Sequence, residues 1–157
     1  MSVQSLKKLA VWKRAKNFAL TIYHEVLPKL PPEEKWGLAQ QIRRSTVSIA
    51  ANIAEGQGRF HYQDNVRFCY IARGSLEETL SHLVFCYEAG FIPADMYLPL
   101  EKEGEEIEKM LFGYIAYLMK AKQGVNNSDL KHSVGEEPAT YDTEDFDLDT
   151  APLFSNF

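Results

Sequence analysis

Four stretches of this 157-residue chain repeat their apolar residues every three or four positions, and proline or glycine separates each stretch from the next. This spacing puts the apolar side chains of each stretch on one face of an α-helix. No stretch alternates apolar and polar residues as a half-buried strand would. Because short connections between long amphipathic helices favour antiparallel neighbours, the sequence predicts an all-α fold, an antiparallel up-down four-helix bundle.

Proline and glycine residues set the expected helix boundaries. Three prolines within residues 28–32 end the first helix, because proline and the residue before it disfavour helical geometry. Gly56 and Gly58 are expected to end the second helix in the left-handed conformation that glycine adopts easily. Gly90 and Pro93 end the third. The four predicted helices extend over about residues 9–26, 33–55, 62–87 and 94–122.

The formal net charge of −5 hides an uneven distribution of charge along the chain. Residues 1–73 contain twelve Lys or Arg against five Asp or Glu, whereas residues 74–125 contain four against nine. Residues 126–157 contain one lysine and eight acids, a net charge of −7. The basic amino-terminal half can attract phosphates, so the acidity of the whole chain does not exclude a nucleic-acid partner.

The acidic carboxyl-terminal segment is not expected to belong to the bundle. It loses the apolar period of the fourth helix, and its composition cannot bury enough apolar surface to offset the entropy of ordering. We therefore divide the chain into a bundle, residues 1–123, and an acidic, disordered tail, residues 124–157. The tail could simply solubilise the protein, dock on a partner or compete for the basic face. Its candidate docking residues are Phe146, Leu148, Phe154 and Phe157.

The second predicted helix differs from the others in having two apolar faces. Large aliphatic residues such as Ile42 and Ile49 form one face, whereas Val47 and the alanines at 50, 51 and 54 form the other. A surface helix needs only one apolar face, so the second face could meet another subunit. Between the faces runs a polar stripe that could bond within the subunit, across an interface or to a ligand. The stripe consists of Gln41, Arg44, Ser48, Asn52 and Glu55.

Basic residues on and near the first two helices are the best candidates for contact with phosphate. Arg43 and Arg44 lie on the second helix, and Arg59 follows its glycine-rich end. Lys13 and Lys16 lie on the first helix and add to the same positive half. Arginine and lysine are the usual side chains that contact nucleic-acid phosphates, so these five residues form our predicted nucleic-acid site.

The sequence contains no convincing catalytic or metal-binding motif. His82 and Cys86 are four residues apart, but Cys69 would lie well away from them around the helix, and there is no Cys-x-x-Cys. His61 and Asp64 follow the glycine turn without a nucleophile motif or a phosphate loop, and such positions are usually helix starts. Both cysteines are expected in the core. We therefore expect no enzyme, no catalytic residue, no metal and no cofactor.

The expected compartment follows from cysteine usage and hydropathy. Two cysteines and the lack of a secretory segment favour a reducing compartment, so we expect a cytoplasmic protein. Charged residues interrupt every apolar run before it reaches the ~18 residues that span a bilayer, so we expect no membrane partner.

Three motifs in the second predicted helix and its approach carry a family resemblance. They are Pro31-Pro-Glu-Glu-Lys-Trp-Gly-Leu38, Gln41-Ile-Arg-Arg44 and Asn52-Ile-Ala-Glu-Gly-Gln-Gly-Arg59. They closely resemble the signature of the 23S rRNA intervening sequence proteins, also called four-helix-bundle proteins. Leu9-Ala-Val-Trp12 and Ile71-Ala-Arg-Gly-Ser-Leu-Glu-Glu78 extend the resemblance to about residues 6–122. The signature positions fall on Gln41, Arg43, Arg44, Ser48, Asn52, Glu55, Gly56, Gly58 and Arg59.

The resemblance implies a small cytoplasmic bundle that assembles into a ring of five and is not an enzyme. The sequence is also similar to the accessory variability determinant proteins of diversity-generating retroelements, which form basic pentameric barrels that bind nucleic acid and a reverse transcriptase. We therefore expect a homo-oligomer whose basic half binds RNA, DNA or a nucleic-acid enzyme. The alternative is a protein-only scaffold that recruits a partner through its acidic-aromatic tail.

Overall fold

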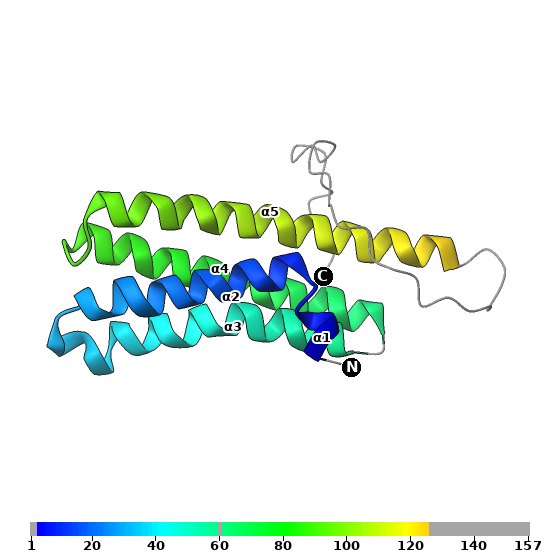
Figure 1. Ribbon diagram of the computed structural model, residues 1–157, viewed down its shortest axis with the longest axis horizontal. Helices are drawn as coiled ribbons and strands as arrows, with labels where there is room; N and C mark the ends of the chain where they lie inside the picture. The colour runs from blue at the N-terminus through cyan, green and yellow to red at the C-terminus, as the bar shows by residue number, and fades with distance from the viewer. Residues whose placement is uncertain (1–2, 60, 126–157) are drawn as a thin grey trace, which may run out of the picture.

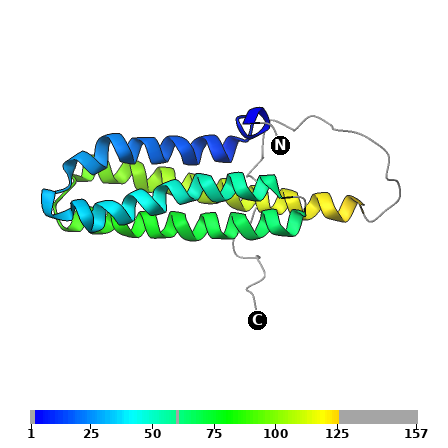
Figure 2. The same ribbon diagram turned by 90° about the horizontal axis from the view of Figure 1, so that it is seen from below.

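The computed structural model describes residues 3–59 and 61–125, which form a bundle of four long antiparallel helices (Figures 1 and 2). Consecutive helices are neighbours, and the last helix also packs on the first, which closes the bundle. The predicted all-α up-down bundle is confirmed. Within these residues no helix is both long enough and apolar enough to cross a membrane. The helices are α1 (Val3–Leu6), α2 (Ala10–Thr21), α3 (Leu38–Gly58), α4 (Tyr62–Glu88) and α5 (Ala94–Val125).

The first predicted helix continues beyond α2 in a less regular form. A π-helical turn, η1 (Ile22–Val26), follows α2, and a 3₁₀ turn, η2 (Leu27–Lys29), follows that turn. Ile22 and Val26 are fully buried, so the wider turn still directs apolar side chains into the core. The regular α-helix therefore ends at Thr21, earlier than expected, whereas the helical path continues through Pro28 to Lys29.

The second predicted helix begins later than expected. Residues Pro32–Trp36 form a separate 3₁₀ turn, η3, and Gly37 separates this turn from α3. The Glu34 carboxylate accepts a hydrogen bond of 3.0 Å from the N–H of Leu38. This bond satisfies one of the free N–H groups at the start of α3, which explains why the helix restarts there.

The glycines near the end of α3 do not adopt the left-handed conformation that the sequence predicted. The helix continues through Gly56 to Gly58, and among the described glycines Gly90 has the positive φ, 74°. Gly56 is buried against α4, where an added Cβ would lie 2.8 Å from Oδ1 of Asn65 and 2.9 Å from Cβ of Phe68. Glycine is therefore required here by the close approach of two helices, not by a turn.

The end of α4 confirms the predicted stop at Gly90. The N–H of Phe91 donates to the carbonyl of Cys86 at 2.9 Å, and the N–H of Gly90 donates to the carbonyl of Tyr87 at 3.0 Å. This pair of bonds around a left-handed glycine is the Schellman pattern, which closes a helix and reverses the chain. Helix α5 then continues to Val125, slightly beyond the expected end of the bundle at residue 123.

Apolar side chains from all four long helices fill the core, among them Phe18, Ile42 and Ile107. Cys69 and Cys86 are fully buried, as expected. Burial raises the pKa of the Cys69 thiol to about 12 and that of the Cys86 thiol to about 11. A thiol that stays protonated at neutral pH is a poor nucleophile, so both cysteines act as packing residues.

Candidate nucleic-acid interface

The polar stripe of α3 is largely bonded within the subunit. The hydroxyls of Ser48 and Ser75, on α3 and α4, lie 2.9 Å apart. The amide of Asn52 donates to the carbonyl of Ser48 at 2.8 Å and to its hydroxyl at 2.9 Å. Glu55 forms an ion pair with Arg59 at the end of the helix. Of the alternatives that the sequence left open, the structure therefore supports bonding within the subunit for Ser48, Asn52 and Glu55.

A second hydroxyl contact lies deeper between the same two helices. The hydroxyl oxygen of Thr79 lies 2.9 Å from that of Ser45 and 2.8 Å from the carbonyl oxygen of Ser75. Together with Ser48 and Asn52 these residues form a polar seam along the α3–α4 contact. The sequence analysis missed the α4 side of this seam, although Ser75 and Thr79 have the four-residue spacing of one helix face.

The outer face of the α3–α4 pair remains apolar and exposed in the single chain. Val47 on α3 is 47% exposed, Ile71 on α4 is 43% exposed and Phe85 is 56% exposed. Ala51 is exposed on the same side of α3, opposite the buried Ile49. Val47 and Ala51 of the predicted second face are therefore uncovered, whereas Ala50 and Ala54 are half-buried and Ala50 packs against the core. The uncovered face is narrower than the sequence predicted.

The five predicted phosphate-binding residues do not form one patch. Lys13 and Lys16 lie in the first two turns of α2, near the end of the bundle at which α3 ends with Arg59 (Figure 1). Arg43 and Arg44 lie near the other end of α3, about 22 to 24 Å from Arg59 along the helix axis. Arg59 is also engaged elsewhere, because its guanidinium carbon lies 4.9 Å from the centre of the Phe68 ring.

The structure gathers further cations that the sequence analysis did not select. The amino-terminal end of α2, the end of α3, the start of α4 and the end of α5 all lie at one end of the bundle (Figures 1 and 2). Exposed basic side chains come from each of these segments and from the α1–α2 connection. We call this surface the basic end, and it consists of Lys7, Lys8, Lys13, Arg59, Arg67 and Lys120.

The opposite end of the bundle is acidic. Carboxylates gather there on η1, on η3, at the end of α4 and at the start of α5, whereas the lysines at this end are Lys29 on η2 and Lys35 on η3. The charge of the bundle is therefore distributed unevenly along its long axis. The acidic residues are Glu25, Glu33, Glu34, Glu88 and Asp95.

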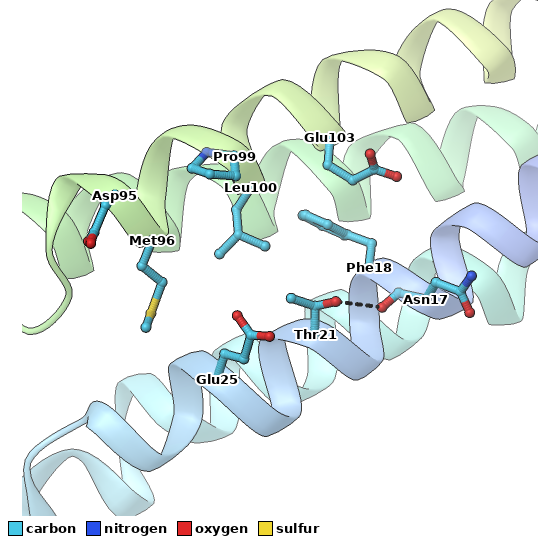
Figure 3. A pocket seen from close by; sticks show the side chains of 9 residues that line it. All are labelled: Asn17, Phe18, Thr21, Glu25, Asp95, Met96, Pro99, Leu100 and Glu103. Carbon is cyan, nitrogen blue, oxygen red and sulfur yellow. Dashed lines mark hydrogen bonds between the residues drawn. The ribbon is translucent and has the colours of Figure 1, made fainter.

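A shallow cleft of about 300 Å³ lies between α2, η1 and α5 (Figure 3). Phe18 and Leu100 meet between the helices, and the carboxylates of Glu25, Asp95 and Glu103 lie around them. Such a rim repels phosphate, so the cleft is not part of a nucleic-acid interface. Among the described residues no three His, Cys, Asp or Glu side chains gather as a metal site requires.

Several carboxylates of α5 form ion pairs between helices. Glu103 binds the guanidinium of Arg14 on α2 through two bonds of 2.7 and 3.0 Å, and Glu108 accepts a bond of 2.8 Å from Arg73 on α4. Desolvation, the charge of Glu108 and a hydrogen bond to it raise the pKa of the neighbouring Glu77. These contacts attach α5 to both of its neighbours, and they remove Arg14 and Arg73 from the cations available to a ligand.

The predicted docking residues Phe146, Leu148, Phe154 and Phe157 lie outside the described residues. The separate acidic tail expected for residues 124–157 therefore stays a prediction from composition.

The closed bundle with a polar seam between α3 and α4 defines a four-helix-bundle protein. The chain belongs to the 23S rRNA-intervening sequence protein family, whose family model matches residues 7–113. It is similar to the 1.70 Å crystal structure of a protein of unknown function from the S23 ribosomal protein family of Bacteroides thetaiotaomicron. The two share 28% identity with a TM-score of 0.62, over 68% of this chain and 98% of that one. No curated protein matches the chain. The family predicted from the sequence is confirmed.

Proposed function

We propose that the protein is a non-enzymatic, cytoplasmic homo-oligomer, a ring of five, that binds nucleic acid through its basic end. The observation that carries the proposal is the convergence of six exposed cations from separate helices on one end of the bundle. Lys13, Lys16 and Arg59, selected from the sequence, lie at this end. The family name refers to 23S rRNA, which makes RNA the first ligand to test.

The remaining predicted residues, Arg43 and Arg44, lie outside the basic end, about 22 to 24 Å from Arg59 along the axis of α3. Between them and Arg59, the exposed face of α3 carries Val47 and Ala51. The proposed subunit contact covers these two residues, so the proposed nucleic-acid site is limited to the basic end.

Counterion release makes this proposal quantitative. Each phosphate neutralised on a duplex contributes about −0.9 to the slope of log affinity against log salt concentration. Arg59 already pairs with Glu55, so the other five cations of the basic end predict a slope of up to about −4.5 per bound subunit. Affinity for a short RNA that does not change between low and physiological salt would contradict the proposal.

Charge reversal tests whether RNA affinity depends on the basic end itself or only on the net charge of the protein. The test variant carries Lys7→Glu, Lys8→Glu and Lys13→Glu, and the control carries Lys29→Glu, Lys35→Glu and Lys102→Glu. All six lysines are exposed, so both variants change the net charge equally. We expect the test variant to lose at least about tenfold in RNA affinity relative to the control at low salt. Equal losses, or no RNA or DNA binding by any form including one that lacks residues 126–157, would refute the proposed site.

The uncovered outer face of α3 and α4 supports the homo-oligomer. Val47, Ile71 and Phe85 are large apolar residues that a second copy could cover, and the small Ala51 allows a close approach of backbones. We expect Ala51→Glu to shift the mass in sedimentation equilibrium towards the 17.9 kDa monomer. Leu98→Glu is the control, because Leu98 is 56% exposed on α5. A wild-type protein that is monomeric at micromolar concentration would end the oligomer proposal.

A further inference from the structure

The path of the chain brings an acidic segment to a basic surface. Helix α5 ends at Val125 on the same end of the bundle as the basic end (Figures 1 and 2). The 32 residues that follow carry a net charge of −7. The opposite end of the bundle is acidic and repels such a segment. Charge complementarity therefore favours contact of the acidic segment with the basic end, where the segment starts.

We propose that residues 126–157 dock on the basic end of their own bundle and compete there with nucleic acid. This inference rests on the proposed function, because competition requires that the same cations bind phosphate. The tail carboxylates and the phosphates of a ligand need the same lysines and arginines, so the two cannot be bound at full strength together.

The reach of the tail is sufficient for this contact. A random coil of 32 residues would have a root-mean-square end-to-end distance of about 30 Å. The segment starts at the basic end, so the cations there lie within this distance. The opposite end of the bundle is farther away, because the 27 residues of α4 are about 40 Å long. A tethered segment of this length has an effective concentration on the order of millimolar near its attachment point. Even weak binding is therefore populated in the intact chain.

The basic end also offers apolar contacts. Tyr117 is 42% exposed and Met119 is 53% exposed, both beside Lys120 on the last turns of α5. The tail alternates acids with large apolar residues, such as Phe146 and Leu148. A surface that mixes cations with exposed apolar side chains matches this pattern in both respects. This match distinguishes docking from the action of an acidic segment that only raises solubility.

The first test uses the full chain. The test variant changes four tail acids to amides (Asp142→Asn, Glu144→Gln, Asp145→Asn and Asp147→Asn). The control changes four exposed acids of the bundle (Glu33→Gln, Glu88→Gln, Asp95→Asn and Glu105→Gln), which gives the same net charge. We expect the tail variant to bind a short RNA about tenfold more tightly than the control at low salt, with a smaller difference at higher salt. Equal affinity of the two variants would overturn the competition.

The second test measures docking without nucleic acid. A fluorescent peptide of residues 126–157 is titrated with the fragment 1–125, which contains the whole described bundle and its buried core. We expect binding that weakens in the Lys7→Glu, Lys8→Glu, Lys13→Glu fragment and persists in the Lys29→Glu, Lys35→Glu, Lys102→Glu fragment.

The two tests separate failure of the inference from failure of the proposed function. If RNA binds the fragment but the peptide does not, the tail inference is wrong and the proposed function stands. If the peptide binds the basic end but no nucleic acid does, the proposed function is wrong, and the competition with it. Peptide binding that is unaffected by reversal of the basic end would overturn the docking site itself.

Discussion

Gly56→Ala tests the close packing of α3 on α4 directly. The added Cβ would lie 2.8 Å from Oδ1, 3.0 Å from the carbonyl oxygen of Asn65 and 2.9 Å from Cβ of Phe68, all closer than such contacts normally allow. Asn65 has little freedom to move, because it is buried and its amide donates to the hydroxyl of Tyr114 at 3.0 Å. The helices themselves must therefore separate locally to admit the methyl group.

The magnitude follows from two opposing effects. Overpacking of a tight contact costs about 1 to 3 kcal/mol, whereas alanine recovers up to about 1 kcal/mol of helix propensity relative to glycine. We expect Gly56→Ala to lower the free energy of unfolding by about 1 to 2 kcal/mol. Gly74→Ala is the matched control in α4, where an added Cβ meets nothing within 4 Å. This control should raise the free energy of unfolding by about 0.5 to 1 kcal/mol.

Urea unfolding at one fixed protein concentration measures both variants, because association of subunits would otherwise change the apparent stability. The expected result is a lower midpoint for Gly56→Ala and a higher midpoint for Gly74→Ala, with unchanged slopes. A Gly56→Ala protein as stable as the wild type would refute the argument that packing, not a turn, requires glycine at this position.

Four further predictions concern the core and the helix contacts. Burial raises the pKa of Cys69 to about 12 and that of Cys86 to about 11, so alkylation at pH 8 should be at least about 100-fold slower in the native protein than in urea. The cysteine thiols lose their protons at a lower pH in the unfolded chain than in the folded one. The free energy of unfolding should therefore fall as the pH rises above 9.0. Equal urea midpoints at pH 8 and 10 would contradict this prediction. A double-mutant cycle of Arg14→Gln and Glu103→Gln should give a coupling of about 0.5 to 1 kcal/mol, since both side chains are partly exposed, and zero coupling would show that the pair does not stabilise the bundle. Thr46→Val should raise the free energy of unfolding by up to about 1 kcal/mol, because among the described residues the hydroxyl of Thr46 is buried without a partner, and a destabilised variant would contradict this.

The sequence by itself determined the helices and much of their arrangement, because these depend on local properties. Apolar spacing of three and four, together with the prolines and Gly90, was sufficient to predict four helices and the stop of α4. The second apolar face of α3 was also visible, since Val47 and Ile49 are only two residues apart and point to opposite sides. The dense motifs around α3 identified the family.

The tertiary structure alone decided the role of Gly56 and the composition of the candidate site. A glycine near a helix end looks the same in sequence whether a turn or a neighbouring helix requires it, and only the distances to Asn65 and Phe68 distinguish the two. Likewise, the sequence did not show which cations share one patch. Arg43 and Arg59 belong to the same segment of sequence, but the helix between them keeps them about 24 Å apart. Lys7, Arg67 and Lys120 are distant in sequence, and the packing of antiparallel helices brings the ends of their segments together.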